Sequence, residues 1–337
     1  MLIISPHMSS SDHFSKQTSV LVTGGCGAIG SCVVNYLTHA YPDTLFVNLD
    51  ALTYAANKDN IKTPPNNNYV LAHGDICDVD FVKATINKYQ PSIVIHLAAE
   101  THVDLSFGNS FQFTKTNIMG THTLLECFRE HTGLKLFVHM STDEVYGSVD
   151  DDSPACCESS MFAPSNPYSA TKAGAEMLCH AYNKSFKLPI IIVRCNNAIS
   201  PFQHPEKLIP QCVQRILNNQ KINIHGDGSA KRTFIHATDI ARALDVIVAQ
   251  HVDNFTESKI YNIGSNMEYD VLTVVKEVLR QLRPGENWLD WVNYVPDRAF
   301  QDYRYHIDSS ALRAIGWKEE IGFEDAIADV IRHSILH

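Results

Sequence analysis

Short apolar runs alternate with helix-period stretches over the first half of the chain. Five runs are rich in β-branched residues and contain few polar positions: 18–24, 44–50, 68–75, 92–99 and 134–141. Helices are expected between them over 29–40, 78–89 and 111–131. Strands buried on both faces read as continuous apolar runs, so this order predicts a doubly wound α/β sheet of parallel strands. A helix over 167–187 and a strand over 188–195 complete the unit.

The pattern changes after Arg194. Residues 196–210 are rich in Pro and Asn, and 225–234 carry an Asp-Gly turn between extended segments. Helical periodicity returns at 238–250, 270–282 and 322–336, with a strand over 259–264. We therefore predict a large, doubly wound domain of residues 18–194 with 235–265. A smaller C-terminal α/β substrate-binding domain would comprise residues 195–234 with 266–337.

Composition narrows the class of protein. The 337 residues are 45% hydrophobic, enough for a sizeable core, yet no run approaches the ~18 apolar residues of a membrane span. The net charge of −10 without a basic stripe argues against a nucleic-acid partner. Nine scattered cysteines favour a reduced, cytoplasmic protein, and no His or Cys pattern indicates a metal site. Residues 1–17 lack a signal-peptide pattern, and we interpret them as a disordered tail.

A glycine-rich turn links the first strand to the first helix. Gly24, Gly27 and Gly30 permit a tight turn, close backbone approach to a pyrophosphate and close helix packing. Asp50 ends the second strand 20 residues after Gly30, where a carboxylate accepts hydrogen bonds from ribose hydroxyls and repels a 2′-phosphate. This pattern predicts a Rossmann-type site that prefers NAD to NADP, against the alternative of a plain glycine turn and a solvated Asp. Three more residues follow strand ends, where such a sheet binds its ligand: Asp75, Ala98 and Ala99.

Two Tyr-x-x-x-Lys pairs occur in different contexts. The pair beginning at Tyr54 lies in a loop, whereas Tyr168 and Lys172 follow Asn166-Pro167, which start a helix. Positions i and i+4 share a helix face, so the Lys172 ammonium is expected to lower the pKa of the Tyr168 phenol and make it a usable base. An ordinary amphipathic helix is the alternative.

Thr142, Asp143 and Glu144 stand at the carboxyl end of the fifth strand, beginning 26 residues before Tyr168. Two adjacent carboxylates in different environments can act as separate acid and base. A solvated turn uses the same residue types. The combination with the Tyr-Lys pair and the glycine turn is what predicts a catalytic site.

Together these motifs resemble an extended short-chain dehydrogenase/reductase and, more narrowly, the nucleotide-sugar 4,6-dehydratases acting on UDP-glucose or dTDP-glucose. The resemblance rests on TGGCGAIG, DALTYAAN, HLAAETHVD, TNIMGTH, STDEVYG, NPYSATKAGAEM, PEKLIP and YNIG. It runs from about residue 18 to the C-terminus. The Asp143-Glu144 pair is its most discriminating feature, because epimerases and decarboxylases of that superfamily generally lack it.

The resemblance implies a mechanism. Tyr168, supported by Lys172 and Thr142, would take the C4 hydroxyl proton while hydride passes from C4 to NAD. Glu144 would remove the C5 proton, and Asp143 would protonate the departing C6 hydroxyl. Hydride would then return to C6 and give a 4-keto-6-deoxyglucose nucleotide.

The resemblance also implies ligand contacts. NAD would be bound by Gly24, Gly27, Ala28, Ile29, Gly30, Asp50, Asp75, Ile76, Ala98, Ala99, Thr101, Tyr168 and Lys172. The sugar nucleotide would be bound by Asn196, Glu206, Lys207, Leu208, Arg232, Asn266 and Arg298. A homodimer is expected through the helices at 111–131 and 167–187, with Ala173, Met177 and Ala181 on an apolar face.

Departures from the bacterial dTDP-glucose pattern favour UDP-glucose, and with it UDP-rhamnose or another deoxysugar as the eventual product. Ala299-Phe300-Gln301-Asp302 stands where Pro-Gly-His-Asp is typical, and Leu105 replaces a frequent arginine. Three alternatives stay open: a dTDP-glucose-specific enzyme, a sugar-nucleotide 4-epimerase, and a non-catalytic NAD-binding regulator.

Overall fold

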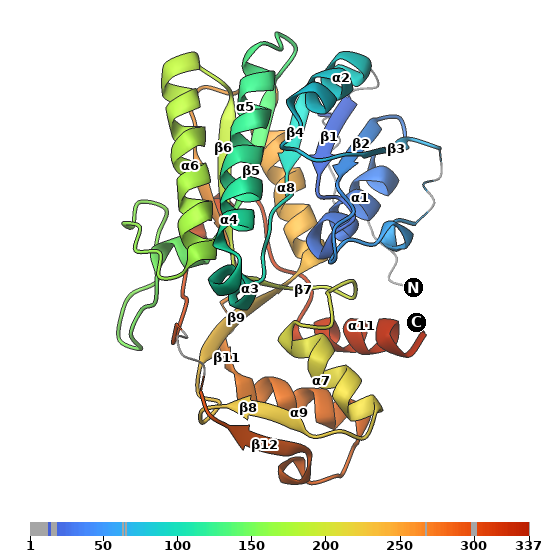
Figure 1. Ribbon diagram of the computed structural model, residues 1–337, viewed down its shortest axis with the longest axis vertical. Coiled ribbons are helices and arrows are strands. Elements are labelled where there is room, and N and C mark those ends of the chain that lie inside the picture. The colour runs from blue at the N-terminus through green and yellow to red at the C-terminus, as the bar shows by residue number, and fades with distance from the viewer. Residues whose placement is uncertain are drawn as a thin grey trace.

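Seven parallel strands form one sheet in the order β10-β6-β5-β4-β1-β2-β3 (Figure 1). The computed structural model describes residues 13–14, 19–62, 64, 66–266, 268–297 and 302–336. The strands are β1(Ser19–Thr23), β2(Leu45–Asp50), β3(Tyr69–His73), β4(Ile93–His96), β5(Leu136–Thr142), β6(Ile190–Cys195) and β10(Ile260–Ile263). The predicted doubly wound α/β sheet is confirmed.

Helices cover both faces of this sheet, which explains the continuous apolar runs. In β1, Val20 and Val22 lie in one core with α1(Ala28–Ala40) and α8(Ala237–His251). Leu21 lies in the opposite core, which is covered by α2(Val79–Tyr89), α5(Thr121–Arg129) and α6(Pro167–Phe186). Successive residues of the strand are therefore buried on opposite sides, as a period of two requires.

Helix α6 begins where the sequence predicts. Asn166 accepts a hydrogen bond from the Ser169 backbone N–H at 2.8 Å, and the Ser169 hydroxyl accepts one from the Asn166 backbone N–H at 3.2 Å. Pro167 occupies the first turn, where its missing N–H costs nothing. The helix ends at Phe186, and Lys187 after it has a left-handed backbone with φ 61°.

The predicted helix over 111–131 is divided in the structure. The segment comprises α4(Ser110–Phe113), the π-helix η2(Thr114–Gly120) and α5, and α3(Val103–Gly108) precedes it. A π-turn shifts the helix face by one residue, which hydrophobic periodicity does not reveal. Within η2, Asn117 is buried and its side chain donates to the Glu100 carbonyl at 3.1 Å and to the Thr171 hydroxyl at 3.0 Å.

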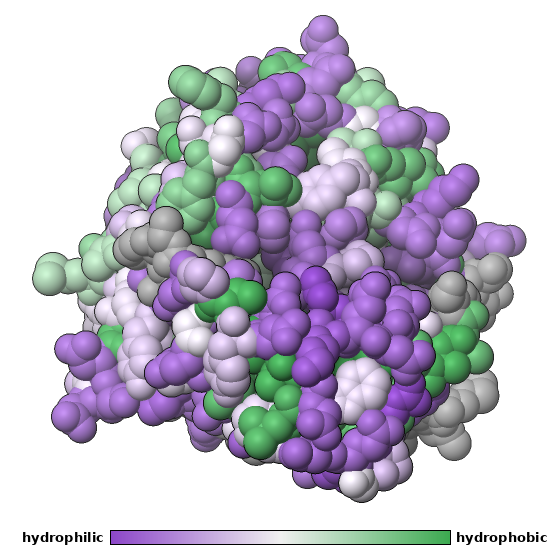
Figure 2. All heavy atoms as spheres, turned by 60° about the horizontal axis from the view of Figure 1, so that its bottom comes forward, coloured by the Kyte–Doolittle hydropathy of each residue, from purple (hydrophilic) through white to green (hydrophobic). Residues whose placement is uncertain are grey.

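A smaller lobe lies beyond one end of the large sheet (Figure 1). It contains a three-stranded sheet of β7(Asn197–Ile199), β9(Lys231–His236) and β11(Glu268–Asp270), and a pair of β8(Ile222–His225) and β12(Val292–Val295). Its helices α7(Leu208–Leu217), α9(Val271–Leu282) and α11(Phe323–Leu336) share a separate core. Figure 2 looks toward this lobe, whose surface is mostly hydrophilic with small hydrophobic patches.

Two parts of the predicted organisation differ from the structure. The short helix α10(Ser310–Ala314), assigned above to the small domain, packs on the large sheet, and Leu312 and Trp317 are buried in its core. In the predicted tail, Phe14 is 1% exposed and packs against Phe46 and Tyr41, because its ring completes the core beside α1. Apart from His13 and Phe14, residues 1–17 lie outside the described part of the chain.

Three short 3₁₀ segments complete the described elements: η1(Lys58–Asn60), η3(Asp143–Tyr146) and η4(Trp288–Trp291). Among all the helices in the described ranges, none combines the length and the apolar character needed to cross a membrane.

Candidate active site

Five strand ends bring the chemical groups singled out above to one edge of the large sheet. Gly24 follows β1, Asp50 ends β2, Ala98 follows β4, Thr142 ends β5 and Asn196 follows β6. All five strands are parallel, so these residues share the carboxyl edge, where open α/β sheets bind their ligands. The small lobe faces the same edge (Figure 1).

The glycine turn after β1 has no room for a side chain at Gly24 or at Gly30. Gly24 has φ +72°, and a Cβ there would lie 2.6 Å from the Ala98 Cα atom. A Cβ on Gly30 would lie 2.1 Å from the Gly24 carbonyl oxygen. Helix α1 starts after Gly27, which provides no side-chain cap, so a phosphate can approach the N–H groups of the first turn formed by Ala28 and Ile29.

Asp50 is held rigidly at the end of β2. Its buried carboxylate accepts hydrogen bonds from the backbone N–H groups of Cys26 and Leu52, each at 2.8 Å. Each carboxylate oxygen keeps a second acceptor site for a ribose hydroxyl, whereas a 2′-phosphate would meet a fixed negative charge. The glycine turn and Asp50 therefore fit a dinucleotide without a 2′-phosphate.

The remaining residues of the predicted dinucleotide set follow β3 and β4. The Asp75 carboxylate accepts from the Cys77 N–H at 2.9 Å and lies 3.8 Å from the Lys115 ammonium, and Ile76 beside it is buried. After β4, the Ala98 N–H donates to the Thr23 hydroxyl at 3.2 Å, and Ala99 is half-buried. Thr101 is exposed at the end of this loop.

Thr142, Asp143 and Glu144 form a buried turn at the end of β5. The Thr142 hydroxyl donates to Asp143 Oδ1 at 3.2 Å and accepts from the Glu144 N–H at 3.3 Å. It thereby caps η3, which turns both carboxylates into the site. All three side chains are buried, which excludes a solvated turn.

The environments of these two carboxyl groups bring both pKa values close to neutrality. Burial raises the pKa of Asp143 to about 6, and a hydrogen bond from Asn196 opposes this shift. Burial and the charge of Asp143 raise the pKa of Glu144 to about 7, against a hydrogen bond from Asn166. Groups with such pKa values can both donate and accept protons near pH 7.

The expected effect of Lys172 on Tyr168 is wrong for this structure. Burial and the Glu144 charge raise the pKa of the Tyr168 phenol above its ordinary value, and a hydrogen bond with Thr142 opposes them. Burial lowers the pKa of Lys172 to about 8, and its ammonium donates to the Met140 carbonyl at 2.6 Å. Both groups lie in a low-dielectric interior. There, the free-energy cost of desolvating each charged form exceeds the stabilisation that the charge of the other group would give.

Asn166 and Tyr305 contact the acid pair although the sequence did not assign them to the site. The Asn166 amide donates to Glu144 Oε2 at 3.0 Å, and the Tyr305 hydroxyl lies 3.4 Å from the same oxygen. Asn166 was recognisable only as a helix cap. Tyr305 is 161 positions from Glu144, and no local motif could have connected them.

The predicted sugar-nucleotide residues are only partly brought together. Asn196 donates to Asp143 Oδ2 at 2.6 Å. Arg232 lies with its guanidinium carbon 4.9 Å from the centre of the Tyr305 ring and donates to the Asp302 carbonyl at 2.8 Å. Its charge lowers the pKa of both Asp143 and Glu144. Asn196 and Arg232 therefore adjoin the acid pair.

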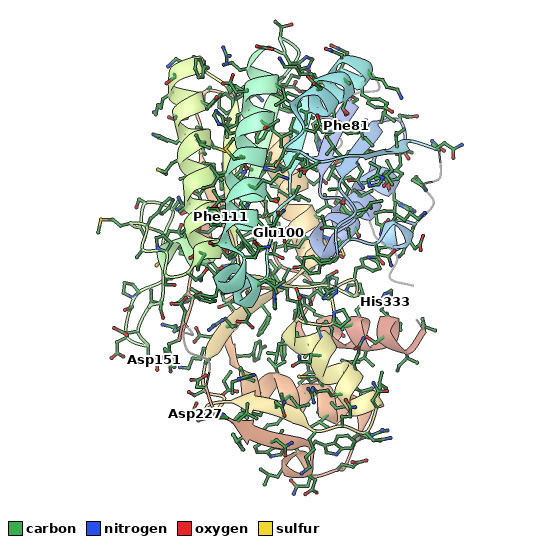
Figure 3. All side chains as sticks on the ribbon, viewed as in Figure 1. Phe81, Glu100, Phe111, Asp151, Asp227 and His333 are labelled. Atoms are coloured by element: carbon green, nitrogen blue, oxygen red, sulfur yellow. The ribbon has the colours of Figure 1, made fainter. Side chains whose placement is uncertain are left out.

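The segment Glu206, Lys207 and Leu208 lies where α7 begins, between the two lobes. The Lys207 ammonium donates to the Thr101 carbonyl at 3.3 Å, which joins α7 to the loop after β4. Glu100 on this loop lies near the centre of the molecule in Figure 3. Asn266 is exposed and accepts from Arg313 at 3.0 Å, and Arg298 lies outside the described residues.

Across the described ranges, no group of three or more His, Cys, Asp or Glu side chains is arranged to hold a metal ion.

Comparisons with known proteins give a consistent family. Residues 21–330 match the family model described as GDP-mannose 4,6 dehydratase. A trifunctional UDP-glucose 4,6-dehydratase/UDP-4-keto-6-deoxy-D-glucose 3,5-epimerase/UDP-4-keto-L-rhamnose-reductase of Arabidopsis thaliana is 42% identical over 93% of this chain. The match spans only 46% of that relative. A dTDP-D-glucose 4,6-dehydratase of Mus musculus is 39% identical over 94% of this chain and 88% of its own length.

A solved structure agrees with these relatives. The dTDP-glucose 4,6-dehydratase of Streptomyces venezuelae, crystallised with NAD and TYD bound, has a TM-score of 0.86 and 36% sequence identity. The match covers 95% of this chain and 97% of that one.

Proposed function

Because the chain belongs to the GDP-mannose 4,6-dehydratase family, we propose that it dehydrates a nucleoside-diphosphate glucose to its 4-keto-6-deoxy derivative. The observation that carries this proposal is the buried Asp143-Glu144 pair beside Tyr168. Oxidation of a hydroxyl needs one base. Elimination of water needs a second base and an acid, and this site holds both.

The glycine turn, Asp50 and the loop after β4 would hold NAD, and the bound nicotinamide would supply the hydride chemistry between C4 and C6. Tyr168 takes the C4 hydroxyl proton, assisted by its hydrogen bond with Thr142. Lys172 lies one helical turn after Tyr168 on α6, where it is buried and donates to the Met140 carbonyl. The 4-ketone so formed acidifies the neighbouring C5 hydrogen.

The two carboxyl groups then act in opposite directions. Glu144, oriented by Asn166, removes the C5 proton, and Asp143, oriented by Asn196, gives a proton to the C6 hydroxyl as it leaves as water. One carboxyl gains the proton while the other loses one. Both pKa values, about 7 for Glu144 and about 6 for Asp143, lie near neutrality, so each group can change its protonation state during turnover.

UDP-glucose is our preferred substrate, and UDP-rhamnose or another deoxysugar is the eventual product. Support comes from Leu105, which is exposed where bacterial dTDP-glucose enzymes often have arginine, and from the Arabidopsis relative named for UDP-glucose. The mouse relative, named for dTDP-glucose, keeps that substrate as the alternative. Competition between equal concentrations of the two nucleotides decides between them.

The first experiment is incubation of the purified protein with UDP-glucose or dTDP-glucose, followed by mass spectrometry. A dehydratase product is lighter than its substrate by one water. A 4-epimerase product has unchanged mass, and a non-catalytic regulator leaves the substrate intact. Recovery of only unchanged mass with both nucleotides would overturn the proposal.

A homodimer through α4, η2, α5 and α6 forms part of the proposal. These helices lie together over one face of the sheet, and Phe111, labelled in Figure 3, is 87% exposed on α4. Met119 on η2 and Met177 on α6 are also exposed, whereas Ala173 is buried in the protomer. Exposed apolar side chains at this density are typical of a surface covered by a second copy.

We also place the protein in the cytoplasm. All nine cysteines are unpaired, as expected for chains kept in a reducing compartment. The negative net charge and the buried, polar site favour a small sugar nucleotide as the partner over a nucleic acid.

A further inference from the structure

Glu144 stands at one end of a chain of hydrogen-bonding groups. The Tyr305 hydroxyl lies 3.4 Å from Glu144 Oε2 and also makes a short hydrogen bond to the Asp302 carboxylate. The Ser165 hydroxyl donates to the same Asp302 oxygen at 2.5 Å. Glu144, Tyr305 and Asp302 are all buried, so water reaches none of these bonds freely.

The number of protons fixes the direction of these bonds. A phenol has one proton, and the Asp302 contact is the shorter of its two, so the Tyr305 proton lies toward Asp302. Glu144 Oε2 then faces a lone pair of the phenol oxygen. An ionised Glu144 gains nothing from that lone pair, whereas a protonated Glu144 can donate a hydrogen bond to it.

We propose that Tyr305 and Asp302, the relay pair, carry a proton between Glu144 and solvent; this rests on the proposed dehydratase reaction. After Glu144 has taken the C5 proton, it passes its proton to the Tyr305 oxygen. Tyr305 at the same time releases its own proton to the Asp302 carboxylate. Glu144 is again ionised, Tyr305 is again a neutral phenol, and the protonated Asp302 loses its proton to water. The same transfers in reverse bring a solvent proton to Glu144, which then gives it to C5.

Asp302 is the member of the relay pair that borders a recess in the small lobe. It lines a polar recess of about 100 Å³ together with His225, Asp227 and Asp297. Asp227, labelled in Figure 3, lies on the small lobe away from the large sheet. The relay pair therefore links the base at the sheet edge to the surface of the other lobe.

The charged groups around Glu144 act on its proton in opposite directions, so that it can both take up and release a proton. Asp143 and Asp302 raise its pKa, and Arg232 lowers it. The Arg232 guanidinium stacks on the Tyr305 ring, where a positive charge opposes accumulation of a proton on the phenol oxygen. Tyr168 on α6 also senses this site, because the charges of Glu144 and Asp143 add to burial in raising the pKa of its phenol.

The test uses the hydrogen at C5 of the sugar. The full-length NAD-loaded protein converts the sugar nucleotide in D₂O, and the deuterium at C5 of the product is measured by mass spectrometry. A carboxylic acid holds one proton, so an isolated Glu144 returns the same hydrogen to C5. The wild type is expected to give mostly deuterated C5. Tyr305→Phe and Asp302→Asn are expected to reduce that fraction at least threefold.

Three controls separate this effect from damage to the site. Transfer of a C4 deuterium to C6 should be unchanged in both variants, because that step does not use the relay pair. Tyr303→Phe alters an exposed neighbour whose hydroxyl bonds Asp151, and it should match the wild type. Asp302→Glu keeps the carboxylate and should restore much of the exchange.

The outcomes distinguish the two proposals. If both Tyr305→Phe and Asp302→Asn give the same deuterium fraction at C5 as the wild type, the relay pair is overturned, whereas the proposed dehydratase reaction stands. Absence of any dehydrated product from the wild type would overturn the dehydratase itself. If a variant turns over too slowly, exchange of the C5 hydrogen of added product with D₂O is measured instead. If one variant does not fold, the other decides.

Discussion

Asn196 donates its side-chain N–H to Asp143 Oδ2 at 2.6 Å, although 53 residues separate the two. Gly264 makes this contact possible, because a Cβ at that position would lie 2.0 Å from Asn196 Oδ1. The amide orients the carboxyl group that we assign as the acid. It also holds the pKa of that group below the value that burial alone would give.

Asn196→Ala is therefore expected to raise the pKa of Asp143 above about 6. Loss of a hydrogen bond to a charged group corresponds to roughly 1–2 pH units. The alkaline limb of the profile of kcat against pH should move to higher pH by this amount, because Asp143 must be protonated to act as an acid. Asn197→Ala, a change at the next residue on β7, provides the control, and an identical profile for both variants would contradict the assignment.

Glu144→Gln should abolish C5 proton removal while leaving NAD bound. An amide keeps the size and polarity of the side chain but cannot accept a proton. We expect product formation to fall at least ~100-fold, in the range typical of a lost general base. C5 exchange in D₂O and the NAD content of the purified variant are the two measurements. Near-normal dehydration by this variant would remove Glu144 from its role.

Asp143→Asn should slow loss of water more than the oxidation at C4. The amide cannot give a proton to the leaving hydroxyl, whereas Tyr168 and Thr142 remain in place. Single-turnover absorbance of the reduced nicotinamide should therefore rise at near wild-type rate and decay at least ~10-fold more slowly. Equal slowing of the rise and the decay would show that Asp143 does not act specifically in the elimination.

Burial of Glu144 should cost the protein stability at alkaline pH. Folding raises the pKa of Glu144 from 4.5 to about 7, so the folded state binds a proton more tightly than the unfolded state does. Stability is therefore lost as the pH rises from 4.5 through about 7. A shift of this size corresponds to about 3 kcal/mol, so Glu144→Gln should unfold at higher denaturant concentration than the wild type at pH ~8.

The stability gained by Glu144→Gln over the wild type should shrink toward pH ~5, where the Glu144 carboxyl group is protonated in the folded state and increasingly so in the unfolded state. Glu257→Gln replaces an exposed carboxylate and should leave stability unchanged at both pH values. If the difference in stability between Glu144→Gln and the wild type is the same at all pH values, the charge of Glu144 is not the cause of that difference.

The double variant Phe111→Asp, Met177→Asp should convert a dimer into monomers. Two carboxylates placed on this exposed apolar face would have to lose their hydration in the interface, at a cost of several kcal/mol. Light scattering on a sizing column measures the mass. Met161→Asp is the matched control, because Met161 is 89% exposed on a loop outside these helices. A wild type that elutes as a monomer would contradict the dimer.

Local patterns determine much of this protein. The apolar runs specify β1, β5 and β6, because parallel strands covered on both faces need no polar alternation. Gly24, Gly27 and Gly30 specify the turn, and Asn166-Pro167 specify the start of α6. Each of these signals acts over a few residues, so it is readable without knowledge of the rest of the chain.

Only the tertiary structure decided the contacts between distant segments and the balance of charges in the interior. The approach of Tyr305 to Glu144 depends on how the segment after Asp302 crosses between the lobes, which no periodicity encodes. The pKa of Tyr168 rises where the spacing to Lys172 predicted a fall, because burial penalises the phenolate more than a helical neighbour stabilises it. Sequence spacing reports which groups are near one another along a helix, but desolvation depends on everything packed around them.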